Sequence, residues 1–187
     1  FLVKNQEDLY ALRPEATASV ARAYIENNFD KQSGFSKLYY LGPMFRLERP
    51  QKGRLRQFHH IGCEAIGSGL PEADIETICL ADALLNVWQV KGSILKLNSL
   101  GCSQDKNKLS RQLKNALKVK LSGFCEECNA RYEHNTLRIL DCKKEPCRKQ
   151  IQLLGLNDEP LCPDCKLHFS AVKNGLSGIG ISYVVSP

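Results

Sequence analysis

The stretch that decides the fold runs from residue 37 to residue 67, KLYYLGPMFRLERPQKGRLRQFHHIGCEAIG. Residues 37–48 form an apolar and aromatic run that is typical of a buried strand, and residues 55–67 have the composition of a second strand. Pro50 and Gly53 interrupt the basic segment between them and mark it as a turn or loop. The sequence therefore predicts an antiparallel hairpin with a long basic tip.

The two faces of this hairpin are predicted to differ in chemistry, because successive side chains of a strand point to opposite faces. One face of the second strand would carry Arg56, Phe58, His60, Gly62 and Glu64. On the first strand Arg46 and Glu48 would point the same way. A face this polar is costly to bury unpaired, so it is expected to border a ligand cleft or water. A solvent-facing hairpin with cross-strand ion pairs is the alternative.

Helices and further strands are predicted on both sides of the hairpin. Pro14 suits the first turn of a helix over residues 16–28, and Pro71 precedes an amphipathic helix. Ser103 can cap a helix in which leucine recurs every four residues. A further helix is expected near residues 163–176, with short strands at residues 93–98 and 181–185. The change of character near residue 100 predicts a domain boundary there.

The composition fits a soluble globular protein, with 43% hydrophobic and 25% charged residues among 187. No stretch approaches the roughly 18 consecutive apolar residues of a membrane span, and no signal peptide is visible after Phe1. The nine cysteines are an odd number, which fits a secreted disulfide framework poorly. A reducing, cytoplasmic location without a membrane is expected.

The formal charge of +6 is concentrated in one segment. Residues 101–150 hold 12 basic and 6 acidic side chains. A local basic excess suits a polyanion such as RNA, because cations near phosphates release condensed counterions. A solvated lysine-rich helix would give the same composition.

Two C-x2-C pairs lie in the second half of the chain, Cys125 with Cys128 and Cys162 with Cys165. Each pair can supply two thiolates from one tight turn, so together they predict a structural Zn2+ site with four cysteines. Between and beside them, Cys142, Cys147 and His168 could take the place of a ligand. Free thiols in a reduced domain are the alternative.

The order of the motifs resembles a known family. FRLE at 45–48, a basic loop and RQF at 56–58 resemble motif 2 of class II aminoacyl-tRNA synthetases. The fuller run from Tyr40 to Gly67 resembles the histidyl-tRNA synthetase family in particular, as do LRPEAT at 12–17, NSLG at 98–101, TLRILDCK at 136–143 and ISYVVSP at 181–187. The resemblance implies an α+β fold, with part of the antiparallel class II catalytic sheet and a small, mostly helical insertion domain. Residues 1–100 would belong to the catalytic domain, 101–178 to the insertion domain and 179–187 to a return strand.

The resemblance also implies roles for individual residues. Arg46 would bind the α-phosphate of ATP and the carboxylate of histidine, and its planar fork suits bidentate contact with oxyanions. Glu48 would accept a hydrogen bond from the adenine amino group, and Phe58 would stack on the adenine. Arg54 would lie near the triphosphate.

Other residues would contact histidine or tRNA. The histidine substrate would be held by Glu15, Thr17, Arg46, His60 and Glu64, with Glu64 bonding its imidazole. Contacts to tRNA would come from Arg49, Lys52, Arg56, Lys114 and Lys118. The sequence departs from the family at position 60, where His stands for a usual glutamine, and at Ala16, where glycine is usual.

The implied partners are histidine, ATP with Mg2+, tRNA(His) and a second copy of the chain in a homodimer. Motif 1, motif 3, a second catalytic arginine segment and the anticodon-binding domain are not found, so the chain alone is expected not to aminoacylate tRNA. Two alternatives stay open: a synthetase-like regulatory subunit of ATP phosphoribosyltransferase, and a zinc-stabilised RNA-binding module without chemistry.

Overall fold

The structure, a computed structural model, describes residues 1–5, 7–118, 120–154 and 161–186. The chain forms two compact units, Phe1–Val87 and Trp88–Pro187. Helices and strands are mixed in both, as an α+β fold requires. Within the described residues, no helix has the length and apolar content needed to cross a bilayer.

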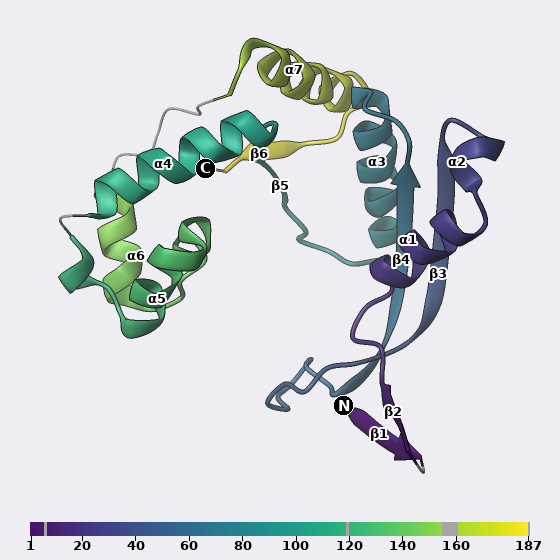
Figure 1. The fold of residues 1–187 in the computed structure, drawn as a ribbon. Coiled ribbons are helices and arrows are strands. Elements are labelled where there is room, and N and C mark those ends of the chain that lie inside the picture. Colours follow the sequence, from purple (N-terminus) through teal and green to yellow (C-terminus); the bar gives the residue numbers. More distant parts are fainter. Residues whose placement is uncertain (6, 119, 155–160, 187) are drawn as a thin grey trace. The chain divides into compact units, whose positions relative to one another are not determined.

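The first unit is built around the predicted hairpin. Its strands are β3 (Ser36–Phe45) and β4 (Gln57–Ile66), which pair in antiparallel register over ten residues each. They are preceded by a small hairpin of β1 (Leu2–Asn5) and β2 (Asp8–Ala11) and by the helices α1 (Thr17–Glu26) and α2 (Phe29–Gln32). Helix α3 (Pro71–Val87) follows β4 and runs alongside the hairpin (Figure 1).

The hairpin confirms the prediction but has a longer tip than expected. The predicted strands covered residues 37–48 and 55–67, whereas β3 ends at Phe45 and β4 begins at Gln57. Residues 46–56 form the tip, which is closed by an isolated bridge between Gln51 and Arg54. Gly53 has a φ of 78°, a conformation that glycine adopts without strain, and it lies in the tight turn between the two bridged residues.

The first helix begins later than predicted. Ala16 is the residue before α1, and Glu15 lies outside the helix. The side chain of Glu15 nevertheless accepts a hydrogen bond from the backbone N–H of Ala18 at 3.4 Å. Glu15 therefore contacts the first turn of α1 from outside it. The N-terminal hairpin of β1 and β2 was not predicted, since its side chains show no clear alternation.

The second unit contains β5 (Leu95–Leu97), α4 (Ser103–Leu117), α5 (Glu126–His134), α6 (Glu145–Gln152), α7 (Pro163–Gly178) and β6 (Tyr183–Val185). Two short 3-10 helices, η1 (Leu121–Gly123) and η2 (Thr136–Ile139), link its helices. Strands β5 and β6 pair in parallel, with Leu95 opposite Tyr183. This pairing ties residues 95–97 to residues 183–185 within the unit Trp88–Pro187. The assignment of 1–100, 101–178 and 179–187 to domains stays a prediction.

A core cluster in the second unit joins α4 to the short helices after it. Leu113 and Leu117 of α4 are fully buried, in keeping with the predicted leucine stripe. The cluster consists of Leu113, Leu117, Phe124, Cys128, Tyr132, Ile139, Cys142 and Cys147. Three of these eight buried side chains are cysteines, so thiols make up much of this core.

Gly67, directly after β4, has a backbone conformation and a close backbone contact that only glycine tolerates. This gives a test of the hairpin. Gly67 has a φ of 103°, and a Cβ there would lie 2.2 Å from the carbonyl oxygen of Gly34. We expect Gly67→Ala to lower the free energy of unfolding by about 1–3 kcal/mol, because it adds both strain and a backbone clash. Urea denaturation followed by circular dichroism measures the change. Gly34→Ala is the matched control, since a Cβ at Gly34 meets nothing within 4 Å. Equal effects of the two substitutions would show that the backbone at Gly67 does not require a glycine.

Candidate functional site

The even-numbered face of the β3–β4 hairpin carries the predicted site. The register places Leu38 opposite Glu64, Gly42 opposite His60 and Met44 opposite Phe58. Phe58, His60 and Glu64 are all half-buried on this face, while the odd-numbered residues of β4 are exposed. The predicted alternation of β4 is confirmed.

Arg46 and Phe58 meet at the open end of the hairpin. The guanidinium carbon of Arg46 lies 5.1 Å from the centroid of the Phe58 ring. The Nε of Arg46 donates to the carbonyl of Pro14 at 2.9 Å, and its backbone N–H donates to the carbonyl of Arg56 at 2.9 Å. These contacts fix the stem of Arg46, and among the described residues its two terminal nitrogens make no hydrogen bond. The fork remains available for an oxyanion.

An open pocket of about 430 Å³ lies beside this pair. Its lining consists of Arg46, Glu48, Gly53, Arg54, Leu55 and Phe58. Arg54 and Glu48 form an ion pair across it at 3.3 Å, and both side chains are partly exposed. Exposed ion pairs are typically worth no more than about 1 kcal/mol, so a ligand can displace this one at little cost. A cation, a carboxylate and an aromatic ring around one hollow are suited to a nucleotide.

Glu64 lies further along the same face and is linked to the first helix. The hydroxyl of Thr17, the first residue of α1, donates to Oε1 of Glu64 at 2.8 Å. The structure thus brings together Thr17 and Glu64, which the sequence analysis assigned to one ligand. Glu15 contacts the first turn of the same helix.

His60 lies between Phe58 and Glu64 and has an unpaired nitrogen. Its Nδ1 is buried and has no hydrogen-bond partner among the described residues. Its ring makes an edge-on contact with Tyr40 at 5.4 Å between centroids and lies 6.4 Å from the Phe58 ring. Buried polar atoms are rarely left unpaired, so this nitrogen is a candidate ligand contact.

Sequence reasoning missed two residues of this face, Tyr40 and Arg13. A Cβ on Gly62 would lie 2.1 Å from the Tyr40 ring, and one on Gly42 would lie 2.6 Å from the Arg13 guanidinium. Arg13 also donates from Nε to the carbonyl of Pro43 at 2.9 Å. The signal was present in the sequence, because a glycine on a predicted ligand-facing side leaves space for a large neighbour.

The residues predicted to contact tRNA fall into two groups. Arg49 and Lys52 are exposed in the hairpin tip, and Arg56 donates from Nε to the carbonyl of Glu48 at 3.3 Å. Lys114 and Lys118 belong to the second unit. Lys118 is exposed at the end of α4.

Lys114 is held by neighbouring side chains. Its Nζ is 5.1 Å from the centroid of the Tyr132 ring and 3.9 Å from a carboxylate oxygen of Glu133. Lys114 therefore has a local packing role in addition to any contact with RNA.

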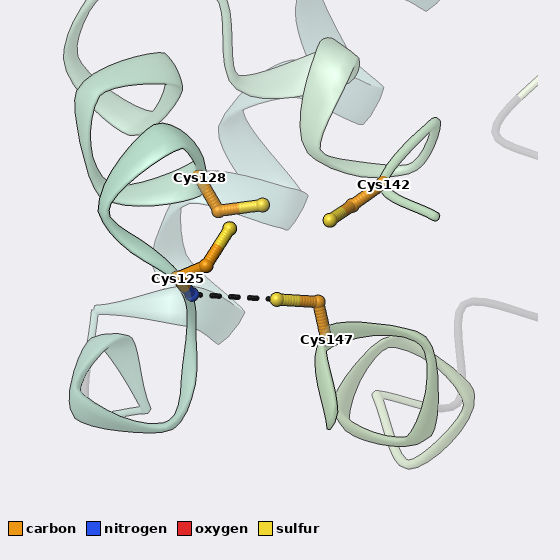
Figure 2. A group of neighbouring side chains, drawn as sticks. All are labelled: Cys125, Cys128, Cys142 and Cys147. Atoms are coloured by element: carbon orange, nitrogen blue, oxygen red, sulfur yellow. Dashed lines mark hydrogen bonds between the residues drawn. The ribbon is translucent and has the colours of Figure 1, made fainter. Parts of the chain in front are cut away.

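The predicted four-cysteine set is wrong in its pairing. The structure places Cys125 and Cys128 with Cys142 and Cys147, as Figure 2 shows. Cys162 and Cys165 belong to a separate group with Cys102 and Asp105. The physical reason is that each C-x2-C pair begins a different helix, α5 or α7, and each helix start packs on its own neighbour. Only Cys142 and Cys147, named as possible substitutes, join the first pair.

Asp105 organises the second of these groups. It is 4% exposed, and its carboxylate accepts hydrogen bonds from the backbone N–H of Cys162 at 3.0 Å and of Cys102 at 3.3 Å. Burial alone would raise the pKa of Asp105, but these hydrogen bonds and those from the thiols of Cys165 and Cys162 hold the pKa below its ordinary value of 3.8. The hydrogen bond to Asp105 in turn raises the pKa of Cys165 to about 12.

The first group contains thiols with unequal acidity. A hydrogen bond from the backbone N–H of Cys128 lowers the pKa of Cys125 to about 7. Burial raises the pKa of Cys128 and of Cys147. A further hydrogen bond runs from the backbone N–H of Cys125 to the sulfur of Cys147 at 3.3 Å (Figure 2).

The antiparallel hairpin, with an arginine on an aromatic ring at its open end and an acid deeper on the same face, is that of a class II aminoacyl-tRNA synthetase. The family model described as histidyl-tRNA synthetase matches residues 2–124. The crystal structure of apo histidyl-tRNA synthetase from S. aureus superposes with a TM-score of 0.77 at 29% identity, covering 100% of this chain and 44% of that one. The chain belongs to the histidyl-tRNA synthetase family.

Curated relatives of this chain support its membership of the family. A histidine–tRNA ligase from Solibacter usitatus is 49% identical over 176 residues, and one from Desulforamulus reducens is 44% identical over 174 residues. These alignments cover 94% and 93% of this chain. The chain spans 42% of the length of each of these relatives.

The lowered pKa of Asp105 predicts that the stability of the second unit depends on pH. Because the folded pKa lies below the unfolded one, its contribution to stability is complete above pH 3.8 and is lost as the pH falls through the lowered folded pKa. We expect Asp105→Asn to reduce the urea midpoint at neutral pH, because an amide cannot accept from both N–H groups. The difference from the unmodified protein should shrink as the pH falls below that range. Asp141→Asn, which changes an exposed carboxylate of the same unit, should leave the midpoint nearly unchanged at every pH. A pH-independent difference for Asp105→Asn would contradict the assignment.

Proposed function

We propose that this chain supplies the ATP- and histidine-binding face of a histidine–tRNA ligase. The enzyme would activate histidine with ATP and Mg2+ and then transfer it to tRNA(His). The observation that carries the proposal is the alignment of Arg46, Phe58 and Glu64 along one face of β3–β4, with the pocket at one end and Thr17 at the other. Membership of the family supports it.

The nucleotide would lie in the pocket at the open end of the hairpin. The adenine would stack on Phe58, with its amino group donating to Glu48 once the ion pair of Glu48 with Arg54 has opened. Arg54 would then be free to follow the triphosphate. Mg2+ bound to the phosphates of ATP would neutralise part of their charge.

Arg46 would be the catalytic residue, because it lies between the nucleotide pocket and the amino acid. The histidine carboxylate attacks the α-phosphorus of ATP in line, the bond to pyrophosphate breaks, and histidyl-adenylate is formed. Negative charge spreads over the α-phosphate oxygens as this happens. A preorganised guanidinium stabilises that charge without reorganisation, since the contact to Pro14 already holds it in place.

Histidine itself would be recognised along the rest of the face. Glu64 would accept from the imidazole, while Thr17 and Glu15 would hold the α-ammonium group. His60 would supply its unpaired Nδ1 as an acceptor for the substrate, in place of the amide usual in the family. A half-buried acid that needs a specific donor rejects amino acids that lack one, because it would be left unpaired.

The remaining features of the proposal concern the assembly. We propose that the protein acts as a homodimer in the cytoplasm and that its basic residues 101–150 contact the phosphates of tRNA.

The activation step gives a direct test. Histidine-dependent exchange of pyrophosphate into ATP is measured with the protein at its full natural length. Arg46→Lys is expected to lower the exchange rate by about 100-fold or more, because a lysine cannot reproduce a bidentate fork. Glu64→Gln should raise the KM for histidine and leave the KM for ATP nearly unchanged. Phe58→Ala should raise the KM for ATP and leave the KM for histidine nearly unchanged.

The matched control is His59→Ala, which removes an exposed imidazole from the opposite face of β4 and should leave both KM values unchanged. The proposal fails if the unmodified protein shows no histidine-dependent exchange. It also fails if Glu64→Gln leaves the KM for histidine as it was.

Contact with tRNA is tested best at Lys118, because this side chain is exposed whereas Lys114 packs on Tyr132. Lys118→Glu is expected to weaken tRNA binding and to reduce the slope of log affinity against log salt by about 1. Fluorescence anisotropy across a salt titration measures both quantities. The control is Lys31→Glu, which reverses the charge of an exposed side chain on α2 and changes the net charge by the same amount. If both reversals had the same effect on affinity and slope, a specific role for residues 101–150 would be excluded.

A further inference from the structure

Four cysteine sulfurs converge in the second unit, and nothing in the proposed reaction uses them. The Sγ atoms of Cys125, Cys128, Cys142 and Cys147 all lie within 4.8 Å of one another. Figure 2 shows them pointing toward one centre from the start of α5, the turn after η2 and the start of α6. We propose that these four cysteines bind one structural Zn2+ ion as thiolates.

The spacing of the sulfurs fits a single tetrahedral ion. A Zn–S bond of about 2.3 Å implies sulfurs about 3.8 Å apart at the corners of the tetrahedron. The observed upper limit of 4.8 Å requires only small side-chain rotations to reach this geometry. Four protein ligands leave no open position for water or substrate, so the ion would be structural and not catalytic.

The backbone around the group favours negatively charged sulfur. Cys128 and Cys147 lie in the first turns of α5 and α6, where unpaired N–H groups and the helix dipole stabilise an anion. In addition, the N–H of Cys125 donates to the sulfur of Cys147 at 3.3 Å. An N–H donor directed at sulfur stabilises a thiolate more than a neutral thiol, because the acceptor then carries a full charge.

The part of the chain that holds the group is poor in other sources of stability. Helices α5 and α6 have 9 and 8 residues, and η1 and η2 have 3 and 4. Helices this short are marginal in water unless tertiary contacts hold them. Cys128, Cys142 and Cys147 are 0%, 7% and 1% exposed and belong to the core cluster. One ion would join the start of α5, the turn after η2 and the start of α6.

The second cysteine group differs in a way that makes it a useful contrast. There the fourth member is Asp105, whose carboxylate already accepts backbone hydrogen bonds from Cys102 and Cys162. Its oxygens are therefore engaged in joining the starts of α4 and α7. We assign no metal to this group.

Iron is the competing metal for four thiolates. In a [4Fe–4S] cluster each thiolate binds a different iron atom, and in a [2Fe–2S] cluster each iron binds two of the four, so in both cases the cysteine sulfurs surround the whole cluster and some of them lie further apart. Sulfurs within 4.8 Å of one another leave room for a single ion and no cluster. In a reducing cell the redox-inert Zn2+ is the ion that four cysteines bind for purely structural purposes.

The test is metal analysis of the protein at its full natural length, purified without chelator. Mass spectrometry is expected to find about one zinc ion per chain. Cys147→Ser should lose the zinc, and the double variant Cys162→Ser with Cys165→Ser should keep it. Cys63→Ser, at an exposed cysteine on the opposite face of β4, is the control and should also keep it.

A measurement on the unmodified sequence covers the case in which Cys147→Ser does not fold. Zinc is removed by a chelator and replaced by Co2+, which should give the intense sulfur-to-metal absorption of a tetrahedral four-thiolate site. Zinc well below stoichiometry together with no such absorption would overturn the proposal. Stoichiometric iron in place of zinc would overturn it, as would loss of zinc from the Cys162 and Cys165 double variant. Because histidine-dependent exchange is assayed separately, failure of the zinc site and failure of the proposed function are distinguishable.

Discussion

The register of β3 on β4 determines which side chains lie together on the face of the hairpin that is proposed to bind ligands. Gly42 lies opposite His60 and Met44 opposite Phe58, and this pairing turns every even-numbered side chain of β4 to one side. A slip of one residue would move all of them to the other face, since the side-chain period of a strand is two. The positions of Arg46, the pocket and Thr17 relative to Glu64 all depend on this register. The two glycines of the face, Gly42 and Gly62, make room for Arg13 and Tyr40 beside it.

Much of this face could be predicted from the sequence. The alternation in residues 55–67 correctly placed Phe58, His60 and Glu64 together, because period-two geometry needs only local information. The sequence also placed Arg46 on this face, and the structure adds its contact with the Phe58 ring. The ends of the strands were less predictable, since residues 46–48 and 55–56 on both sides of the Pro50–Gly53 turn have ordinary strand propensities and yet lie outside β3 and β4. Tyr40 was assigned to a strand but not to the site, because its neighbour across the hairpin is a glycine whose role depends on register.

The cysteines show that sequence spacing alone is insufficient to predict which four of them lie together. Two C-x2-C pairs suggest one four-ligand site, but spacing cannot show which pair faces which helix. Asp105 decides the outcome by accepting from the N–H of Cys162, which fixes the second pair at the start of α4. The first pair then meets Cys142 and Cys147 across the core of the same unit. Contacts between residues 57 positions apart, as between Asp105 and Cys162, are set by the packing of whole helices and not by local pattern.

We place the binding surface for both substrates on the even-numbered face of the hairpin. The most direct measurement is a crystal structure of the protein at its full natural length with histidine and a non-hydrolysable ATP analogue. We expect the adenine ring against Phe58, the α-phosphate within hydrogen-bond distance of the Arg46 guanidinium, and the imidazole of histidine at the Glu64 carboxylate. Density for both ligands elsewhere, with the face between Arg46 and Glu64 covered by protein side chains, would contradict this placement.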